Sequence, residues 1–381
     1  MARKNPPSTN PFHYGSPVMG DQFVGRSQEV AAVESRIRSH VNVVLVSPRR
    51  YGKSSLLAQV EQNLTPAKLA IVHVDLLRCK DLSALAGVMT SQLFHVPGAR
   101  WARMRQAMPE FLRRLRVRPS VTLDEKGLPR FDFGPRLVPS DADQIIADVY
   151  ELLEEVGRAR PAALVLDEFQ AIIQHGEHLP NLLKGLSDEH PGVSLVMAGS
   201  SRHMMERLVL DEKAPLYGMA QRIGLGELPR AEVMTFLRAR AAVGQKAMTE
   251  EAAELIVDTA GPVPNDVQHL AYETFDAAGD VIDVRAVREG FLNGIDHEVP
   301  IYSDRYQSRA PGQRRVLVEL AKSGGTSSPT SAAFAAAVGL ATGASARKAM
   351  KALGDDELAI ERNGKWVVSD PFFAGWLRGF A

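Results

Sequence analysis

The sequence has little cysteine and no long apolar run. Cys79 is the only thiol in 381 residues, so one chain can form neither an internal disulfide nor a cysteine cluster for a metal. Because extracellular frameworks of disulfides are thereby excluded, we expect the protein to act in the cytoplasm. No stretch of about 18 apolar residues occurs, and the first residues are polar and turn-forming, unlike the apolar core of a signal peptide. We therefore expect no membrane segment.

An excess of charge of either sign is also missing. Lys and Arg together number 45, as do Asp and Glu, so the whole molecule lacks the electrostatic signature of a nucleic-acid or membrane binder. Any such binding requires a local patch. The chain is 45% hydrophobic and 24% charged, which is ordinary for a globular protein. Its length predicts several domains, since single cores stop growing at roughly 250–300 residues.

The first 228 residues alternate apolar runs with amphipathic patterns. Short apolar runs, typical of buried parallel strands, occupy 41–46, 69–76, 162–168 and 193–201. Helical periodicity between them predicts a parallel sheet with helices on both faces, hence an α/β fold. A Pro- and Gly-rich stretch at 1–20 predicts an extended arm over this first domain, which we assign to 21–228. Residues 97–140 interrupt the alternation as an insertion, with a hairpin turning near Lys126-Gly127.

Beyond Pro229 the strands stop. Helical patterns at 230–241, 249–259, 264–277 and 284–294 predict a small helical domain at 229–300. An irregular connection at 298–311 then leads to three helices, near 312–322, 329–338 and 342–353. A hairpin with an Asn363-Gly364 turn follows them. Three helices and a hairpin predict a winged-helix domain at 301–381.

A phosphate-binding loop is predicted at 47–54, between an apolar strand and a helix. In the motif G-x-x-x-x-G-K-[ST], backbone N–H groups wrap phosphates, the lysine neutralises the terminal phosphate and the hydroxyl binds magnesium. Gly52, Lys53 and Ser54 match, whereas Ser47 replaces the first glycine, and Gly-Lys-Ser alone can occur by chance. The predicted contacts to ATP are Ser47, Pro48, Arg49, Arg50, Tyr51, Gly52, Lys53, Ser54 and Ser55.

Polar residues at later strand ends complete this predicted site. Asp167 and Glu168 end an apolar run, where a parallel sheet opens its ligand crevice. We expect Asp167 to hold Mg²⁺ together with Ser54, and Glu168 to polarise the attacking water. Ser200 and Ser201 could sense the γ-phosphate or simply cap the next helix. Arg222 could supply positive charge to the phosphates or form a solvated surface ion pair.

Taken together, these segments resemble the archaeal-type ATPase family of the AAA+ superfamily, near its STAND branch. The segments are Asn10-Pro-Phe, Gly15-Ser-Pro-Val, Phe23-Val-Gly-Arg26, the loop, Leu166-Asp-Glu168, Gly199-Ser-Ser201 and Pro215-Leu-Tyr-Gly218. The resemblance implies ATP hydrolysis, the strand order of additional-strand P-loop ATPases, a helical lid and a C-terminal winged helix. It also implies that Phe23, Val24, Gly25 and Arg26 lie near the adenine and ribose, and that Pro264 touches the nucleotide. Family members often carry arginine directly after Leu-Tyr-Gly, where this chain has Met219, so a role for Arg222 requires a shift along the chain.

The work done with ATP has three candidate descriptions. The first is a switch that couples nucleotide state to partner binding through the winged helix, and the second is an ATP-dependent DNA-binding initiator or loader. The third is a scaffold or signalling ATPase whose winged helix holds protein. Seven arginines between 100 and 118, and Arg347, Lys348 and Lys351 on a predicted recognition helix, could contact DNA. The arginines could equally be solvated, and Asp355, Asp356 and Glu357 would repel phosphate. A homo-oligomer is plausible because neighbouring subunits often complete nucleotide sites of this kind.

Overall fold

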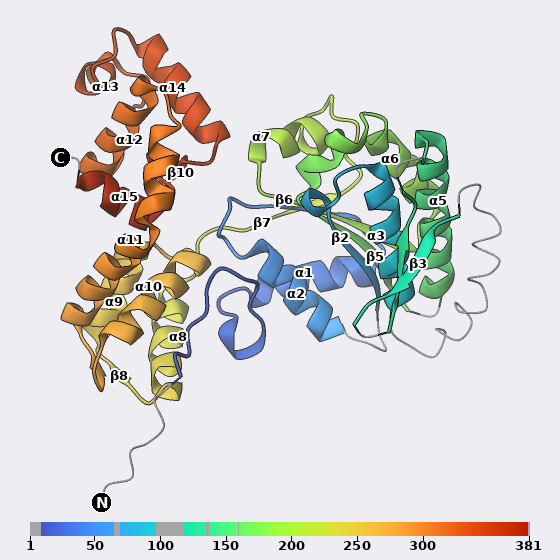
Figure 1. Ribbon diagram of the computed structural model, residues 1–381, viewed down its shortest axis with the longest axis horizontal. Coiled ribbons are helices and arrows are strands. Elements are labelled where there is room, and N and C mark those ends of the chain that lie inside the picture. Colours follow the sequence, from blue (N-terminus) through green and yellow to red (C-terminus); the bar gives the residue numbers. More distant parts are fainter. Residues whose placement is uncertain are drawn as a thin grey trace, which may run out of the picture. The chain divides into compact units, whose positions relative to one another are not determined.

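The computed structural model describes residues 9–64, 69–96, 118–125, 127–134, 137–158 and 160–379. Contacts divide the chain into two units. One comprises Arg26–Pro48 and Lys53–Leu225, and the other comprises Met1–Gly25, Arg49–Gly52 and Gly226–Ala381. Figure 1 labels their helices and strands.

The first unit is built on a five-stranded sheet with the order β2-β5-β6-β1-β7, in which every pair is parallel. Its strands are β1 (Val43–Val46), β2 (Ala70–Asp75), β5 (Ala162–Asp167), β6 (Val193–Gly199) and β7 (Gln221–Gly224). Strand β6 separates β1, which leads into the phosphate loop, from β5, which ends in the carboxylates. With β6 inserted between them, the sheet has the strand order that the resemblance implied. The predicted α/β core is confirmed.

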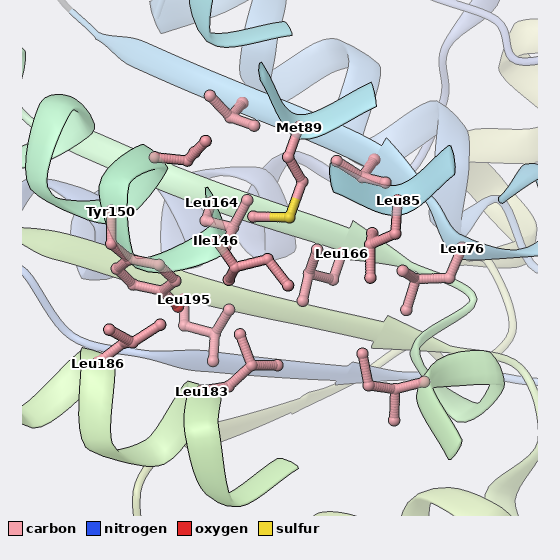
Figure 2. Close-up of a cluster of buried hydrophobic side chains, with 14 of the residues drawn as sticks. Leu76, Leu85, Met89, Ile146, Tyr150, Leu164, Leu166, Leu183, Leu186 and Leu195 are labelled. Carbon is pink, nitrogen blue, oxygen red and sulfur yellow. The ribbon is translucent and has the colours of Figure 1, made fainter. Parts of the chain in front are cut away.

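Helices pack on this sheet because its strands are apolar. α3 (Leu82–His95), α5 (Pro139–Gly157) and α6 (Leu179–Glu189) contact strands β2, β5 and β6, while α1 (Ser27–Arg38) contacts β1, β5 and β7. Figure 2 shows Leu164 and Leu166 of β5 among side chains from α3, α5 and α6. α2 (Lys53–Leu64) packs against α1. The short helices of the first unit are η2 (Leu76–Arg78), η3 (Phe169–His175), α7 (Arg202–Met205) and η4 (Glu206–Leu210). Another short helix, η1 (Gly20–Gln22), belongs to the second unit.

The insertion contains the predicted hairpin. β3 (Ser120–Leu123) pairs antiparallel with β4 (Pro129–Asp132), and Phe131 of β4 packs on Phe94 of α3 with ring centroids 5.2 Å apart. The arginine-rich segment lies outside the described residues except for Arg118, which is exposed.

The one cysteine of the chain is inaccessible. Cys79 follows η2 and is 4% exposed. Burial, with the nearby charges of Asp75 and Asp81, raises the pKa of its thiol to about 11. The side chain therefore stays a neutral thiol at physiological pH.

The second unit combines the predicted helical lid and winged helix. Its lid elements are α8 (Arg230–Val243), β8 (Ala247–Met248), α9 (Glu250–Ala260), α10 (Pro264–Ala277), β9 (Val281–Ile282) and α11 (Val284–Gln307). The winged helix comprises α12 (Pro311–Ser323), α13 (Ala332–Ala337), α14 (Gly343–Asp355), β10 (Ala359–Arg362), β11 (Lys365–Val368) and α15 (Pro371–Arg378). One apolar cluster joins them, since it contains Ile256 and Leu270 of the lid and Leu317 and Phe372 of the winged helix.

One sequence-based expectation about this unit is wrong. The irregular connection expected at 298–311 is largely helical, because α11 continues to Gln307 through Pro300. Packing overrides the proline, since Tyr302 is 2% exposed and lies 5.3 Å from the ring of Phe373. Residues 9–25 of the N-terminal arm belong to this unit, and Phe12 meets Phe275 of α10 edge-on, with ring centroids 6.1 Å apart.

No helix in the described part of the chain combines the length and the apolar character needed to cross a membrane.

Candidate active site

The phosphate loop connects β1 to α2, and its backbone explains its residue types. Gly52 has φ +84°, a left-handed value that favours glycine. The backbone of Ser47 does not have a positive φ, and the residue is 1% exposed. A serine therefore fits where the motif usually has glycine. Arg50 has φ +75°, which costs about 1 kcal/mol for a residue with a side chain. The strain at Arg50 indicates that other contacts hold it.

Lys53, the first residue of α2, lies among the carboxylates that end β5. Its Nζ donates to Asp167 Oδ1 at 2.5 Å and to Glu168 Oε1 at 3.1 Å. The lysine and aspartate side chains are 7% and 9% exposed, so water screens this pair weakly. The structure therefore brings the predicted phosphate lysine and the predicted strand-end carboxylates into one cluster.

Ser54 and Asp167 fit a magnesium ion. Ser54 Oγ donates to Asp167 Oδ2 at 3.0 Å, so a hydroxyl and a carboxylate oxygen already lie together. Magnesium with a nucleotide is held by one or two protein oxygens plus phosphates and water, and this pair supplies that number. The described residues contain no group of three His, Cys, Asp or Glu side chains that could hold a metal by themselves.

Glu168 follows β5 in a left-handed conformation, with φ 52° and ψ 44°. Its Oε2 accepts a hydrogen bond from Gln170 Nε2 at 2.5 Å and another from Ser200 Oγ at 3.0 Å. Ser200, at the end of β6, is 4% exposed. Because β6 lies beside β5, the strand order brings Ser200 to Glu168. Ser201 contributes its carbonyl to the first turn of the next helix, bonded by Met205 N–H at 2.9 Å.

The tip of the phosphate loop, Arg49–Tyr51, contacts lid and winged helix within the second unit. Arg50 Nε lies 2.8 Å from Asp266 Oδ1 of α10, and Arg50 Nη1 lies 3.0 Å from Asp370 Oδ2. Asp370 is the N-cap of α15, where its Oδ1 accepts from the Phe372 and Phe373 amides. Arg50 therefore joins the loop to both parts.

The neighbours of Arg50 repeat this pattern. Arg49 Nε pairs with Glu357 Oε2 at 2.8 Å, although its side chain is 66% exposed. Tyr51 is 6% exposed and hydrogen-bonds Arg362 of β10, which also pairs with Glu227 at 3.2 Å. Three consecutive loop residues thus contact the winged helix.

Burial and charge oppose each other in the Arg50 cluster. Burial disfavours the charge of Arg50, but the carboxylates of Asp266 and Asp370 outweigh this effect and raise its pKa. Burial raises the pKa of Asp266 to about 7, against the attraction of Arg50. Nearby, burial and then the charge of Arg50 lower the pKa of His269 to about 4. His269 lies stacked between Tyr14 and Phe372, with ring centroids 4.1 Å from each.

The other predicted site residues fall in different surroundings. Pro264 begins α10 beside the loop, since a Cβ on Gly52 would lie 3.5 Å from its Cγ. Gly25 has φ +69°, and a Cβ there would lie 3.0 Å from Leu228. Arg26, the N-cap of α1, is 3% exposed and pairs with Glu29. Arg222 lies exposed on edge strand β7 opposite Val44, away from the Lys53 cluster.

Sequence reasoning missed Gln170 and the partners of Arg50. Gln170 follows Glu168 by two residues, so the order Asp-Glu-Phe-Gln was a local signal for it. Asp370 precedes a proline at the start of a helix, which is an N-cap signal and reveals nothing of Arg50. Asp266 gave no signal at all, because its role depends on tertiary contact.

Comparison with known proteins agrees with this geometry. Residues 23–270 match the model of an ATPase domain predominantly from Archaea, and residues 300–379 match that of a probable winged helix domain. Among solved structures, the Walker-type ATPase PABY2304 of Pyrococcus abyssi is similar with TM-score 0.67 and 17% identity, covering 97% of this chain and 99% of the other. The ORC2 protein of Aeropyrum pernix, in ADPNP and ADP complexes, is similar with TM-score 0.54 and 14% identity, covering 93% of each chain. No curated protein matches the sequence.

The sheet order, the phosphate loop and the strand-end carboxylates define a P-loop ATPase of the AAA+ type, with a C-terminal winged helix. The chain belongs to the family of ATPase domains predominantly from Archaea.

Proposed function

We propose that this ATPase is a molecular switch in which the phosphate loop couples nucleotide state to partner binding through the winged helix. The observation that carries the proposal is the position of Arg50. Its side chain pairs with Asp266 of the lid and Asp370 of the winged helix at 2.8 Å and 3.0 Å. A loop that wraps phosphates through its backbone cannot change shape without changing these contacts.

In the chemical step, the residues of the Lys53 cluster exchange partners. Lys53 leaves Asp167 and Glu168 for the terminal phosphate, which carries more negative charge. Ser54 and Asp167 would hold Mg²⁺, and the ion would neutralise charge on the phosphates. Glu168, released from Lys53, orients the attacking water, and Ser200 stays bonded to its other oxygen. ATP and ADP differ at this cluster by one phosphate, so they bias the loop differently.

Coupling between the nucleotide and the winged helix is reciprocal. If ATP weakens or strengthens the contacts of Arg50, then loss of those contacts must change the affinity for ATP by the same factor. Coupling free energies of this kind are typically about 1–3 kcal/mol, or roughly 5- to 150-fold in affinity. A measurement on the nucleotide therefore tests a property of the winged helix.

The test compares the affinities of ATP and ADP in the parent and in Asp370→Asn, both in the hydrolysis-deficient Glu168→Gln background. We expect the ratio of the two affinities to change by at least about 5-fold. Asp304→Asn, an exposed position on α11, is the matched control and should leave the ratio unchanged. An unchanged ratio in Asp370→Asn would contradict the switch. Turnover in Glu168→Gln equal to that of the parent would contradict the role of Glu168.

DNA binding by the winged helix is a second candidate. Arg347 and Lys348 are exposed on α14 and form no ion pair with residues that the structure describes, whereas Lys351 pairs with Asp355 at 2.7 Å. Two free cations on one helix can contact phosphates. If this candidate holds, Arg347→Ala/Lys348→Ala weakens binding of duplex DNA and flattens its salt dependence, whereas Lys351→Ala has a smaller effect. Absence of DNA binding at low salt, with and without ATP, excludes it.

A further inference from the structure

We propose that Gln170 is a positioning residue for ATP hydrolysis. Together with Ser200 it holds one carboxylate oxygen of Glu168, so that the other oxygen faces the attacking water. This inference rests on the role proposed above for Glu168.

The hydrogen bonds around Glu168 treat its two oxygens differently. Oε2 accepts from Gln170 Nε2 at 2.5 Å and from Ser200 Oγ at 3.0 Å. Oε1 accepts from Lys53 Nζ at 3.1 Å. When Lys53 turns to a phosphate, Oε1 loses this donor while Oε2 keeps both of its own. The carboxylate then has one fixed oxygen and one oxygen available for water.

Gln170, Ser200 and Glu168 form a closed triangle, since Gln170 Nε2 also lies 3.4 Å from Ser200 Oγ. An ionised carboxylate only accepts hydrogen bonds, so the amide nitrogen and the hydroxyl hydrogen must both face it. The orientation of the glutamine amide follows from this chemistry. Hydrogen bonds to an ionised group are also the stronger kind.

The triangle is buried and fixed by its backbone. Gln170 and Ser200 are 9% and 4% exposed, and Phe169 between the two site residues is fully buried. The left-handed turn at Glu168 leads directly into η3, which returns Gln170 to the carboxylate two residues later. These side chains therefore have little freedom to adopt other rotamers.

The carbonyl oxygen of the Gln170 side chain supports a functional role for the amide N–H groups of the same side chain. Its carbonyl Oε1 is buried without a hydrogen-bond partner among the residues that the structure describes. A glutamine kept only for structure would be expected to satisfy both ends of its amide, as most buried amides do. This one satisfies only the end that faces Glu168.

Gly199 provides the space for this arrangement. A Cβ at Gly199 would lie 2.8 Å from Gln170 Oε1 and 2.4 Å from Met205 Sδ. Any side chain at this position must displace Gln170 or Met205. Gly199→Ala is therefore expected to disturb the triangle without removing any of its three side chains.

The test is Gln170→Met, which keeps the length of the side chain and removes its donors. We expect kcat to fall roughly 10- to 100-fold, as for loss of one hydrogen bond to a charged group. KM and the affinity for ATP should stay within about 2-fold. Gln144→Met is the matched control, because Gln144 also donates to a carboxylate, that of Asp148 at 2.9 Å on α5. Gly199→Ala gives a second measurement and should lower kcat in the same direction.

A double substitution separates positioning from a structural role. In the Glu168→Gln background, Gln170→Met should cause no further loss of turnover, since residues that act as a unit are not additive. An equal further loss, or a fall in ATP affinity that matches the fall in kcat/KM, overturns the inference. Normal turnover in Gln170→Met with an inactive Glu168→Gln overturns this inference alone. Normal turnover in Glu168→Gln overturns the proposed role of Glu168 as well.

Discussion

Lys53 and Arg50 lie three residues apart in one loop, and each is held by two carboxylates, yet the two clusters differ in origin. The partners of Lys53, Asp167 and Glu168, are adjacent in the sequence at the end of β5. The partners of Arg50, Asp266 and Asp370, come from the first turn of α10 and the N-cap of α15. A strand end supplies the first pair, and two separate helix starts supply the second.

This difference separates chemistry from coupling. A sheet edge holds Asp167 and Glu168 rigidly, which suits the proposed mechanism, in which Lys53 exchanges them for phosphate. Two separate helix starts supply Asp266 and Asp370, and Arg50 ties those helices to the loop. Lys53 should therefore dominate turnover and Arg50 should dominate stability of the second unit.

The largest expected effect lies on the catalytic side of the comparison. Lys53→Ala should lower ATP turnover roughly 100- to 1000-fold, as loss of a group that stabilises transition-state charge does. Steady-state phosphate release measures it. Lys184→Ala, at an exposed position on α6, is the control and should change neither ATP turnover nor ATP binding. Turnover of Lys53→Ala close to that of the parent would remove Lys53 from the site.

Arg50→Met tests the other side. Removing one partner of a buried ion pair leaves the acid uncompensated, and we expect the free energy of unfolding of the second unit to fall by about 3 kcal/mol. Trp366 and Trp376 lie in that unit, so tryptophan fluorescence in a Trp101→Phe background reports its unfolding in urea.

Two further variants sharpen this measurement. Arg49→Met is the matched control in the same loop, and its exposed pair should contribute less than about 1 kcal/mol. Adding Asp266→Asn to Arg50→Met should cost less than the sum of the single changes. Full additivity would mean that Arg50 and Asp266 do not interact.

Two titratable residues near Arg50, Asp266 and His269, predict opposite pH dependences of the free energy of unfolding. Asp266 has its pKa raised to about 7, so its contribution to stability is present below pH ~4 and is lost as the pH rises through 7. His269 has its pKa lowered to about 4, so its contribution is present above pH ~6.5 and is lost as the pH falls through 4. Between these limits the two trends partly cancel.

Single substitutions should expose each trend. In Asp266→Asn the free energy of unfolding should rise with pH between 4 and 6.5 by about 3 kcal/mol, since the pKa of His269 is lowered from 6.5 to about 4 and one pKa unit corresponds to about 1.4 kcal/mol. In His269→Phe, which keeps a ring between Tyr14 and Phe372, it should fall with pH between 4 and 7. Urea unfolding at a series of pH values measures both. Parallel profiles in the two variants would contradict the assignment.

The smallest expected effect separates the two roles of Asp370. Its Oδ1 caps α15 and its Oδ2 faces Arg50. Asp370→Asn can keep the cap and removes the charge, whereas Asp370→Ala removes both, so the alanine variant should be less stable by about 1 kcal/mol. The same urea measurement applies. Equal stabilities would show that the cap contributes nothing beyond the charge.

The Lys53 cluster could be predicted from the sequence because local rules determine it. Buried parallel strands are continuous apolar runs, their carboxyl ends meet at one edge of the sheet, and polar residues at those ends must converge. Lys53, Asp167, Glu168 and Ser200 converge in this way. Gln170 could have been predicted by the same rules, since it follows Glu168 by two residues in the same turn.

The Arg50 cluster could not be predicted in this way. No periodicity relates a loop residue to acids more than 200 residues away, and a buried ion pair depends on how helices pack. Packing also keeps Pro300 inside α11, although a local rule treats proline as a helix breaker. Tyr302, two residues later, contributes to a buried aromatic cluster that stabilises the last turns of this helix. Phe12 likewise placed the arm on α10 by burying a ring beside Phe275.

The buried, protonated thiol of Cys79 makes this chain a natural carrier of spectroscopic labels. Its low accessibility and raised pKa leave it unreactive toward maleimides at neutral pH. Cysteines introduced at Leu123 in the first unit and Val281 in the second, which are 70% and 54% exposed, would then be the reactive thiols. A pair of labels at these positions gives an interunit distance in each nucleotide state, without first removing a native cysteine.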